Sequence, residues 1–203
     1  HMGIGLGGND HIIEYNELHH ILLETHDAGA FYMGRDWSMR GNVVRFNFFH
    51  EMGKGDAQAV YLDDWASGTL VQGNICQGVR RGVLLGGGRD TTIVNNVFVD
   101  CTYAVHIDQR GTGWAKYYFD GSNTTLFDRM KDVNATGPIY TAKYPELATL
   151  LEDEPVLAKN NVIRHNVCVN SEWLSLHHGL TPETEYLHIS DNCVGEDPGF
   201  VNP

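Results

Sequence analysis

Asn95-Asn96-Val97-Phe98 is one of six short segments in which an Asn comes just before apolar or Cys residues, at the end of an alternating run. The other five are Tyr15-Asn16-Glu17-Leu18, Phe46-Asn47-Phe48-Phe49, Gly73-Asn74-Ile75-Cys76, His165-Asn166-Val167-Cys168 and Asp191-Asn192-Cys193-Val194. Such self-similarity indicates one repeated structural unit. An inward Asn at a corner can bond its own turn and the next Asn in a stack, and Asn tolerates a left-handed backbone. The segments therefore predict a ladder of Asn side chains at left-handed corners.

The spacing of these Asn residues predicts coils of three short strands each. Successive steps are 31, 27, 22, 70 and 26 residues, and the step of 70 contains an insertion at about 111–159. A second alternating strand lies between the Asn positions. Period 2 predicts inward side chains at Phe31, Met33, Val60, Leu62, Val83, Leu85, Val105, Ile107, Leu174 and Leu176. The pattern is that of an all-β solenoid with one long insertion of loop and helix.

Five segments carry a family resemblance: Asp27-Ala-Gly-Ala-Phe-Tyr-Met-Gly-Arg-Asp36, Val60-Tyr-Leu-Asp-Asp-Trp65, Leu85-Gly-Gly-Gly-Arg-Asp90, Val94-Asn-Asn-Val-Phe-Val-Asp-Cys101 and Asp197-Pro-Gly-Phe-Val201. Through them the chain resembles the right-handed parallel β-helix proteins of carbohydrate metabolism, which have a pectin lyase-like fold. The resemblance implies a right-handed, single-stranded parallel β-helix. Relatives of this kind include polysaccharide lyases and glycoside hydrolases such as xylosidases and fucosidases.

The expected organisation is one domain. Residues 1–3, His-Met-Gly, are typical of a tag remnant, and residues 4–203 form a single β-helix of about six coils. We expect both ends of the solenoid to be truncated, which would expose strand edges and favour self-association. Within the insertion, Pro145–Glu152 is expected to be helical, with Leu147, Leu150 and Leu151 on one face.

The composition of the 203 residues limits the partners. A formal net charge of −12 disfavours nucleic acid and anionic membranes, and no apolar run is long enough for a transmembrane helix. The 23 Gly and 6 Pro suit tight turns between short strands. The four Cys form no CxxC motif and are interpreted as free thiols in the core, with disulfides as the alternative. Localisation is left open, with a secreted or periplasmic bacterial parent expected.

Candidate catalytic residues lie on the outward face of the aligned strands. One column of this face contains Gly34, Asp63, Gly86, Asp108 and His177. We expect Gly86 and Gly87 to clear space between Asp63 and Asp108, whose backbones lie two coils, or roughly 10 Å, apart. Side-chain lean could bring the carboxylates to about 7–10 Å, the spacing of an inverting glycosidase, or closer, as in a retaining one. Asp27 with Asp63 or Asp64 is a second pairing, and His106 is a further catalytic candidate.

Substrate-binding candidates surround the proposed pair. Tyr32, Tyr61, Trp65 and Trp114 could stack on sugar rings, and the hydrogen-bonding candidates are Arg35, Arg89, Arg110 and His177. Arg89 with Asp90 is also interpreted as a structural ion pair at a turn. The rings at the start of the insertion (Trp114, Tyr117, Tyr118 and Phe119) either line a cleft or attach the insertion to the solenoid.

Three functions remain open from the sequence. The favoured one is a glycoside hydrolase that acts on a plant or microbial glycan through an Asp pair and needs no cofactor. The alternative is a polysaccharide lyase, in which acidic residues would hold Ca²⁺, although Lys is scarce on the aligned face: Lys54 is in a turn and Lys116 in the insertion. The third is a non-catalytic glycan-binding or structural β-helix, because a fold by itself does not select a function.

Overall fold

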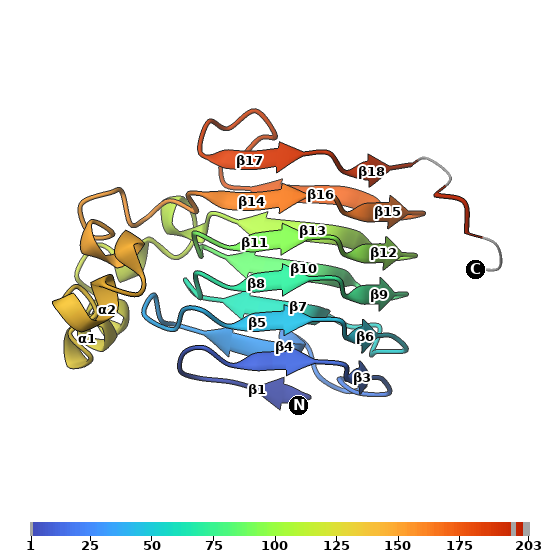
Figure 1. The fold of residues 1–203 in the computed structure, drawn as a ribbon, viewed down its shortest axis with the longest axis horizontal. Helices are drawn as coiled ribbons and strands as arrows, with labels where there is room; N and C mark the ends of the chain where they lie inside the picture. The colour runs from blue at the N-terminus through green and yellow to red at the C-terminus, as the bar shows by residue number, and fades with distance from the viewer. Residues whose placement is uncertain (1, 196–197, 201–203) are drawn as a thin grey trace.

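The chain forms three parallel six-stranded sheets, stacked coil upon coil (Figure 1). The computed structural model describes residues 2–195 and 198–200. The long-strand sheet consists, in order, of β1 (Ile4–Gly5), β4 (Ala28–Gly34), β7 (Ala57–Asp63), β10 (Arg81–Gly86), β13 (Tyr103–Asp108) and β16 (Glu172–His177). The second sheet consists of β17 (Leu187–Ser190), β14 (Asn161–Arg164), β11 (Thr92–Val94), β8 (Leu70–Gln72), β5 (Val43–Arg45) and β2 (Ile12–Glu14). The third consists of β18 (Cys193–Val194), β15 (Val167–Val169), β12 (Val97–Val99), β9 (Ile75–Gln77), β6 (Phe48–Phe49) and β3 (Glu17–Leu18).

The register of the long-strand sheet is the predicted one. Val83 pairs with Val60 on one side and with Val105 on the other, and Leu85 lies between Leu62 and Ile107 in the same way. Of the ten side chains predicted to point inward, eight are buried in the main core and the two on β16 are partly buried against it. The period-2 pattern therefore predicted both the strands and the face that they bury.

The six ladder Asn residues form a continuous chain of side-chain hydrogen bonds. From Asn16 to Asn166, each Nδ2 donates to the Oδ1 of the Asn in the next coil at 2.9–3.0 Å, and the ladder ends at Asn192, whose Nδ2 donates to backbone carbonyls. One detail of the prediction is wrong, because the ladder Asn residues are not the left-handed ones. The residue before each of them has positive φ, as in Phe46 (φ 55°) and Gly73 (φ 62°). The preceding residue makes the corner, and the Asn satisfies the polar groups that the corner buries.

We predict that Asn96→Ala lowers the free energy of unfolding by about 3 kcal/mol, because several buried polar groups lose their partners. The Asn96 amide donates to Asn166 Oδ1 and to the Val71 carbonyl, while its Oδ1 accepts from both nitrogens of Asn74. Urea denaturation measures the effect. The matched control is Asn16→Ala at the exposed end of the ladder, which should cost less than about 1 kcal/mol; equal losses at both sites would contradict the prediction.

The insertion, residues 109–160, separates β13 from β14 and forms the lobe at one side of the stack (Figure 1). It contains η1 (Arg110–Thr112), η2 (Lys116–Tyr118), α1 (Thr125–Asp132), α2 (Pro138–Thr141) and η3 (Pro145–Ala148). The helix expected at 145–152 is wrong in length, since only the short 3₁₀ helix η3 forms there. Leu147 and Leu150 are buried, but Leu151 is 41% exposed. The longest helix, α1, was not predicted from the sequence.

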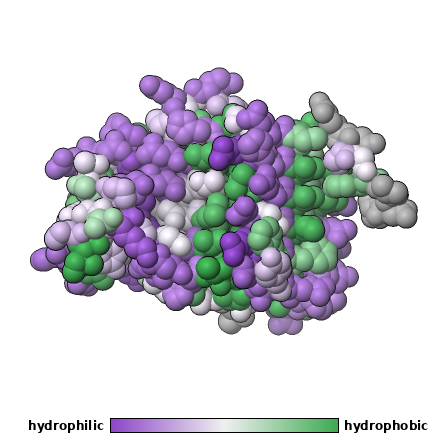
Figure 2. Space-filling view, in the orientation of Figure 1, coloured by the Kyte–Doolittle hydropathy of each residue, from purple (hydrophilic) through white to green (hydrophobic). Residues whose placement is uncertain are grey.

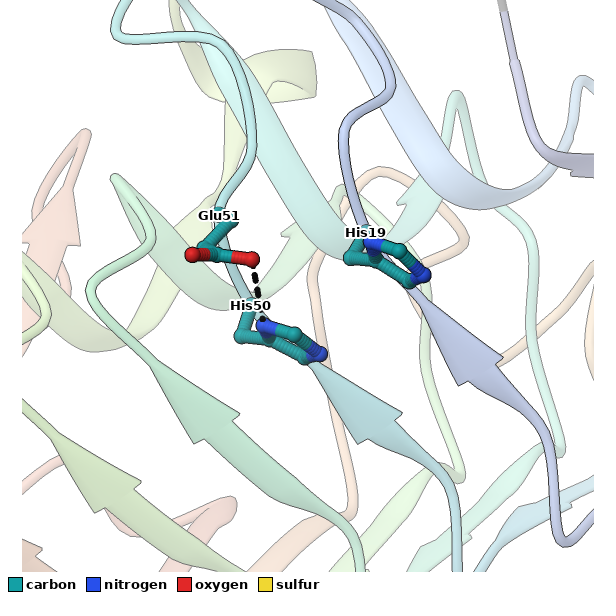
Figure 3. Close-up of side chains that lie close together, drawn as sticks. All are labelled: His19, His50 and Glu51. Atoms are coloured by element: carbon teal, nitrogen blue, oxygen red, sulfur yellow. Dashed lines mark ion pairs between the residues drawn. The ribbon is translucent and has the colours of Figure 1, made fainter.

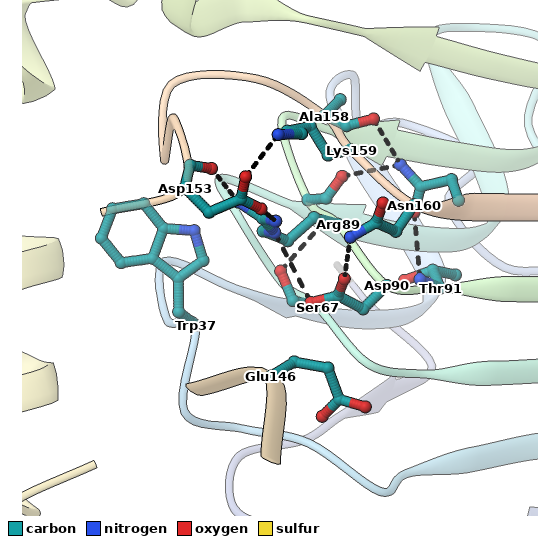
Figure 4. Close-up of polar contacts among 12 residues, drawn as sticks. Trp37, Ser67, Arg89, Asp90, Thr91, Glu146, Asp153, Ala158, Lys159 and Asn160 are labelled. Carbon is teal, nitrogen blue, oxygen red and sulfur yellow. Dashed lines mark hydrogen bonds and ion pairs between the residues drawn. The ribbon is translucent and has the colours of Figure 1, made fainter. Parts of the chain in front are cut away.

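A second apolar core fixes the insertion to the solenoid. Trp37 and Trp65 of the solenoid pack with Tyr118, Leu126 and other side chains of the insertion. Beside this core, the buried Arg89 guanidinium pairs with Asp153, which also binds Lys159 (Figure 4). The insertion is therefore held by both apolar packing and an ion pair between the buried Arg89 and the partly exposed Asp153.

Like residues also gather in columns on the surface. In Figure 2, apolar residues form stripes that run along the stack, across the strands, as expected when equivalent positions of successive coils lie above one another. The four Cys are free, as predicted, and none of the described helices is long and apolar enough to cross a membrane. Three residues named above lie outside the described residues: His1 of the expected tag remnant, and Asp197 and Val201 of the segment at 197–201 that contributes to the family resemblance.

Candidate active site

The candidate site lies where the strands of the long-strand sheet end. After four of these strands the chain turns through a residue with positive φ: Arg35 (63°), Asp64 (28°), Gly87 (76°) and His178 (58°). After β7 the next residue, Trp65, is left-handed as well, with φ of 63°. Two successive left-handed residues without glycine store backbone strain. The surrounding contacts must therefore hold this turn in place.

A cleft of about 460 Å³ opens over this end of the sheet. It is lined by Asp27, Arg35, Asp56, Tyr61, Asp63, Asp64, Arg81, Leu84, His106, Asp108, Arg110, Trp114, Tyr117 and His177. The predicted catalytic residues are all among them. The volume is in the range of sites for small ligands, and the polar lining suits a ligand rich in hydroxyl groups.

Arg110 joins the acidic residues at the bottom of the cleft. Its NH1 donates to Asp63 Oδ1 at 2.6 Å and to Asp64 Oδ1 at 2.7 Å. Asp64 Oδ2 also accepts from Arg35 Nε and from the Tyr118 hydroxyl, both at 3.2 Å. Asp64 thus accepts three hydrogen bonds from protein groups, whereas Asp63 accepts two, from Arg110 and from the Tyr32 hydroxyl at 2.9 Å.

Asp108 occupies the other side of Arg110. Its Oδ2 lies 3.2 Å from Arg110 Nε, but that nitrogen forms no hydrogen bond among the described residues. Asp108 Oδ2 instead accepts from Trp114 Nε1 at 3.1 Å, and its Oδ1 lies 2.6 Å from His178 Nδ1. The two acidic residues therefore differ in their environment, because Asp63 is hydrogen-bonded to the guanidinium and Asp108 to an indole and an imidazole.

The space beside Gly86, expected to be open, is occupied by the Arg110 side chain. A Cβ placed on Gly86 would lie 2.4 Å from the guanidinium carbon of Arg110, and one on Gly87 would lie 3.0 Å from the Trp65 ring. The prediction that these glycines leave room for substrate between Asp63 and Asp108 is therefore wrong. Gly86 leaves room for the guanidinium that links the two acidic residues.

The four aromatic candidates have different positions. Trp65 is fully buried in the second core, so the prediction that it stacks on a sugar is wrong. Tyr61 is almost completely buried and donates its hydroxyl hydrogen to Asp27 Oδ1 at 2.8 Å. Tyr32 is half-buried, and burial together with the charge of Asp63 raises the pKa of its hydroxyl, which stays a donor. The Trp114 ring is 56% exposed and stands over Arg110 at 5.1 Å.

The aromatic start of the insertion serves both predicted purposes. Trp114 and Tyr117 line the cleft and are exposed. Tyr118 and Phe119 pack against Trp65 in the second core. The segment supplies rings to both the cleft and the second core because it lies at the boundary between the cleft and the lobe.

The basic candidates also separate. Arg89 is buried and pairs with Asp153 and, at 3.6 Å, with Asp90, so it is a structural residue and the prediction that it binds substrate is wrong (Figure 4). Arg35 lines the cleft with an exposed side chain. Part of the cleft lining, the ion pair of Asp56 with Arg81, was not predicted. The period-2 alignment could have indicated Arg81, which begins β10, but nothing in the sequence pairs it with Asp56.

His106 and His177 lie side by side on the outward face, with ring centroids 4.6 Å apart. Ser175 lies between them, with its Oγ 2.9 Å from His106 Nδ1 and 3.2 Å from His177 Nε2. Burial, and then the positive charge of Arg81, lower the pKa of His106 to about 4. His106 is therefore a neutral imidazole at neutral pH and can accept or donate a hydrogen bond in the cleft.

The low pKa of His106 predicts a pH dependence of stability. Its imidazole takes up a proton near pH 6.5 in the unfolded chain but near pH 4 in the folded one. Since the unfolded state binds more protons between these values, stability should fall as the pH is lowered through this window, by roughly 2–3 kcal/mol from this residue. Urea denaturation at pH 7, 5.5 and 4 measures it. The His106→Gln variant should lose less stability over the same range, and an identical pH profile would contradict the assignment.

A comparison with family models connects this architecture to known proteins. The model described as a right handed beta helix region matches residues 1–122. The chain belongs to the right-handed β-helix family. This assignment adds the handedness to the three parallel sheets, and the matched part of the β-helix contains Asp63, Asp108 and Arg110. Comparison with curated proteins gives no match, and neither does comparison with solved structures.

Proposed function

We propose that this β-helix is a glycoside hydrolase that uses Asp63 and Asp108. The observation that carries the proposal is that these two acidic residues, on strands two coils apart, line one polar cleft and contact different nitrogens of the same guanidinium. Hydrolysis of a glycosidic bond needs one carboxyl group to protonate the leaving oxygen and another to act as base or nucleophile. Two acidic residues in unlike environments satisfy that requirement.

The hydrogen bonds suggest which acidic residue has which role. A cation hydrogen-bonded to a carboxylate favours its charged form. Asp63 accepts from Arg110 and Tyr32, so we assign it the carboxylate role, as nucleophile or as the base that activates water. Asp108 lies 3.2 Å from Arg110 Nε without a hydrogen bond to it, and 2.6 Å from the His178 imidazole; as the less tightly bound of the two, it is assigned the proton-donor role. Asp64, which has three partners (Arg110, Arg35 and Tyr118), is assigned a positioning role.

The rest of the lining suits a sugar. The exposed rings of Trp114 and Tyr117 offer apolar faces for a pyranose ring, since stacking on aromatic rings buries the C–H faces of sugars. The neutral imidazole of His106 and the exposed His177 offer hydrogen bonds to hydroxyl groups. The cleft thus combines a stacking wall with polar groups that fix orientation.

The ion pairs favour hydrolysis over elimination. A lyase needs positive charge directed at the substrate carboxylate and a base for the C5 proton. Among the described residues that line the cleft, each of the three guanidiniums, on Arg35, Arg81 and Arg110, already pairs with a carboxylate of the protein. Little positive charge is left for a uronate, so a neutral or weakly charged glycan is the better substrate class.

The test is to incubate the full chain with xylan as a neutral glycan and with polygalacturonate as a uronate. Reducing ends are measured by copper reduction and unsaturated products by absorbance near 235 nm, the wavelength at which such double bonds absorb. Reducing ends without the absorbance support hydrolysis. Absorbance that appears only with Ca²⁺ would establish the lyase reaction and overturn the proposal. A panel of aryl glycosides extends the search to other sugars, and inactivity on the whole set would favour the non-catalytic alternative.

A further inference from the structure

Outside the cleft, two neighbouring coils place four ligand-type side chains at one corner. His19 and His20 follow β3, and His50 and Glu51 follow β6. The parallel pairing of Leu18 with Phe49 continues into this corner, because His50 N donates to the Leu18 carbonyl at 3.1 Å and His20 N to the Glu51 carbonyl at 3.0 Å. The register therefore sets His19 beside His50 and His20 beside Glu51.

The side chains converge as the register suggests. The rings of His19 and His50 are stacked, with centroids 5.1 Å apart and planes inclined by 9°. Glu51 points toward His50, and its Oε2 lies 3.3 Å from His50 Nδ1 (Figure 3). One ligand atom from each of His19, His50 and Glu51 lies within 4.8 Å of the others. The Phe48 ring is also stacked on His50, with centroids 4.1 Å apart, and helps to fix the imidazole.

His20 brings a fourth ligand to the same place. Its Nδ1 lies 3.6 Å from Glu51 Oε2 and 2.5 Å from His19 Nδ1. Two imidazole nitrogens at that distance repel each other through their lone pairs unless one holds a proton, or unless the rings turn to share a cation. The corner thus gathers imidazole nitrogens around Glu51 Oε2, while His50 Nε2 lies 2.9 Å from a second carboxylate, Glu17 Oε1.

We propose that His19, His50 and Glu51, with His20 as the fourth ligand, bind one divalent transition-metal ion of the Zn²⁺ class. Imidazole and carboxylate are ligands that Zn²⁺ accepts in tetrahedral sites, whereas Ca²⁺ takes oxygen ligands. With bonds of about 2.0–2.1 Å, tetrahedral ligand atoms lie about 3.3 Å apart. The ligand atoms of His19, His50 and Glu51 lie within 4.8 Å of one another, so the more widely separated ones must move inward. His19 and Glu51 are exposed, so rotation of their side chains supplies this movement without a change in the backbone.

A metal at this site would connect the edge coil of the solenoid to the next coil. β3 is the edge strand of the third sheet and is two residues long, so few backbone hydrogen bonds hold it. A metal bound by His19 and His20 on one side and by His50 and Glu51 on the other links the first coil to the second. Because the ligands come together only in the folded chain, binding should stabilise the native state.

The experiment titrates the full chain, carrying His1→Ser to remove an N-terminal ligand, with ZnCl₂ in a calorimeter. The matched control is His165→Gln, which removes an exposed His at a corner of another coil that faces a single carboxylate, Asp191, at 3.9 Å. We expect one equivalent of Zn²⁺ to bind, and His19→Gln or His50→Gln to weaken binding by at least about tenfold. The control variant should bind as the parent does, and CaCl₂ should give no binding.

Thermal unfolding supplies a second readout. Zn²⁺ in excess should raise the unfolding midpoint of the parent and of His165→Gln but not of the double variant His19→Gln/His50→Gln. The His50 side chain is 16% exposed and packs on Phe48, so the Zn²⁺-induced shift of each protein is measured from its own midpoint without metal. The proposal is overturned if the parent binds no Zn²⁺, or if the double variant binds it with unchanged affinity and midpoint shift.

Discussion

Asp63→Asn and Asp108→Asn are each expected to lower kcat/KM for the substrate found in the glycan screen by at least about 10³-fold. Asn keeps the shape of the side chain but can neither give a proton nor attack an anomeric carbon. The contacts indicate that the two substitutions remove different chemical roles. Asp63 is the carboxylate held by Arg110 and Tyr32, so its loss should remove the base or nucleophile, whereas loss of Asp108 should remove the acid next to His178.

Leaving groups separate these two roles. A substrate with a good leaving group, such as a dinitrophenyl glycoside, needs little protonation, so Asp108→Asn should recover much of its activity on it and Asp63→Asn should not. Azide added to Asp63→Ala can enter the space of the missing carboxylate and restore turnover, which a variant that is merely misfolded would not show.

The controls for this prediction lie in and outside the cleft. Asp27→Asn keeps an acceptor for the Tyr61 hydroxyl and should lose less than about tenfold, while the exposed Asp191→Asn should match the parent. If Asp27→Asn is as damaging as Asp63→Asn, the catalytic pair is Asp27 with Asp63, the second pairing that the sequence suggested. Full activity in Asp108→Asn would exclude the present assignment.

Arg110→Met is expected to lower the free energy of unfolding by about 3–5 kcal/mol, the cost of removing one partner from a buried ion pair. The guanidinium is nearly inaccessible and lies within 3.2 Å of the carboxylates of Asp63, Asp64 and Asp108. Burial opposes its charge, but Asp63 and Asp64 more than offset this and raise the pKa of Arg110. Without it, the largely buried carboxylates of Asp63 and Asp64 lose the cation to which both are hydrogen-bonded. Urea denaturation at pH 7, followed by circular dichroism, measures the loss.

Arg35→Met is the matched control, since it also removes a guanidinium from Asp64, at 3.2 Å, but one with a 57% exposed side chain. Its cost should stay below about 1 kcal/mol, as for other exposed pairs. The triple variant Arg110→Met/Asp63→Asn/Asp64→Asn should regain part of the lost stability, because two of the uncompensated charges are removed with their partner. A loss below about 1 kcal/mol in Arg110→Met would show that the ionic cluster is not a stabilising centre of the cleft.

Much of the fold could be predicted because it is encoded locally. Each strand alternates apolar and polar residues, and each coil repeats an Asn at its corner, so a few residues at a time indicate the period and the register. The stacking of Val60, Val83 and Val105 follows from that register. The insertion does not repeat, so its short helices carried no such signal, and α1 was missed.

The site was predicted in its members but not in its arrangement. Alignment of the coils placed Asp63 and Asp108 on one face, since parallel strands in register bring equivalent positions together. It could not place Arg110, whose side chain turns back from the insertion into the space beside Gly86. For the same reason Trp65 and Arg89 were misassigned, because the lobe that buries them comes from residues more than 40 positions further along the chain.

The sequence by itself determined the solenoid, the Asn ladder and the face on which the acidic residues lie. These features depend on period and register, which are properties of neighbouring residues and of identical steps between coils. Only the tertiary structure decided which polar groups meet: the guanidinium between Asp63 and Asp108, the exposed ring of Trp114 beside the buried ring of Trp65, and the convergence of His19, His50 and Glu51. Such contacts depend on side-chain direction and on packing between distant segments, and no local pattern records them.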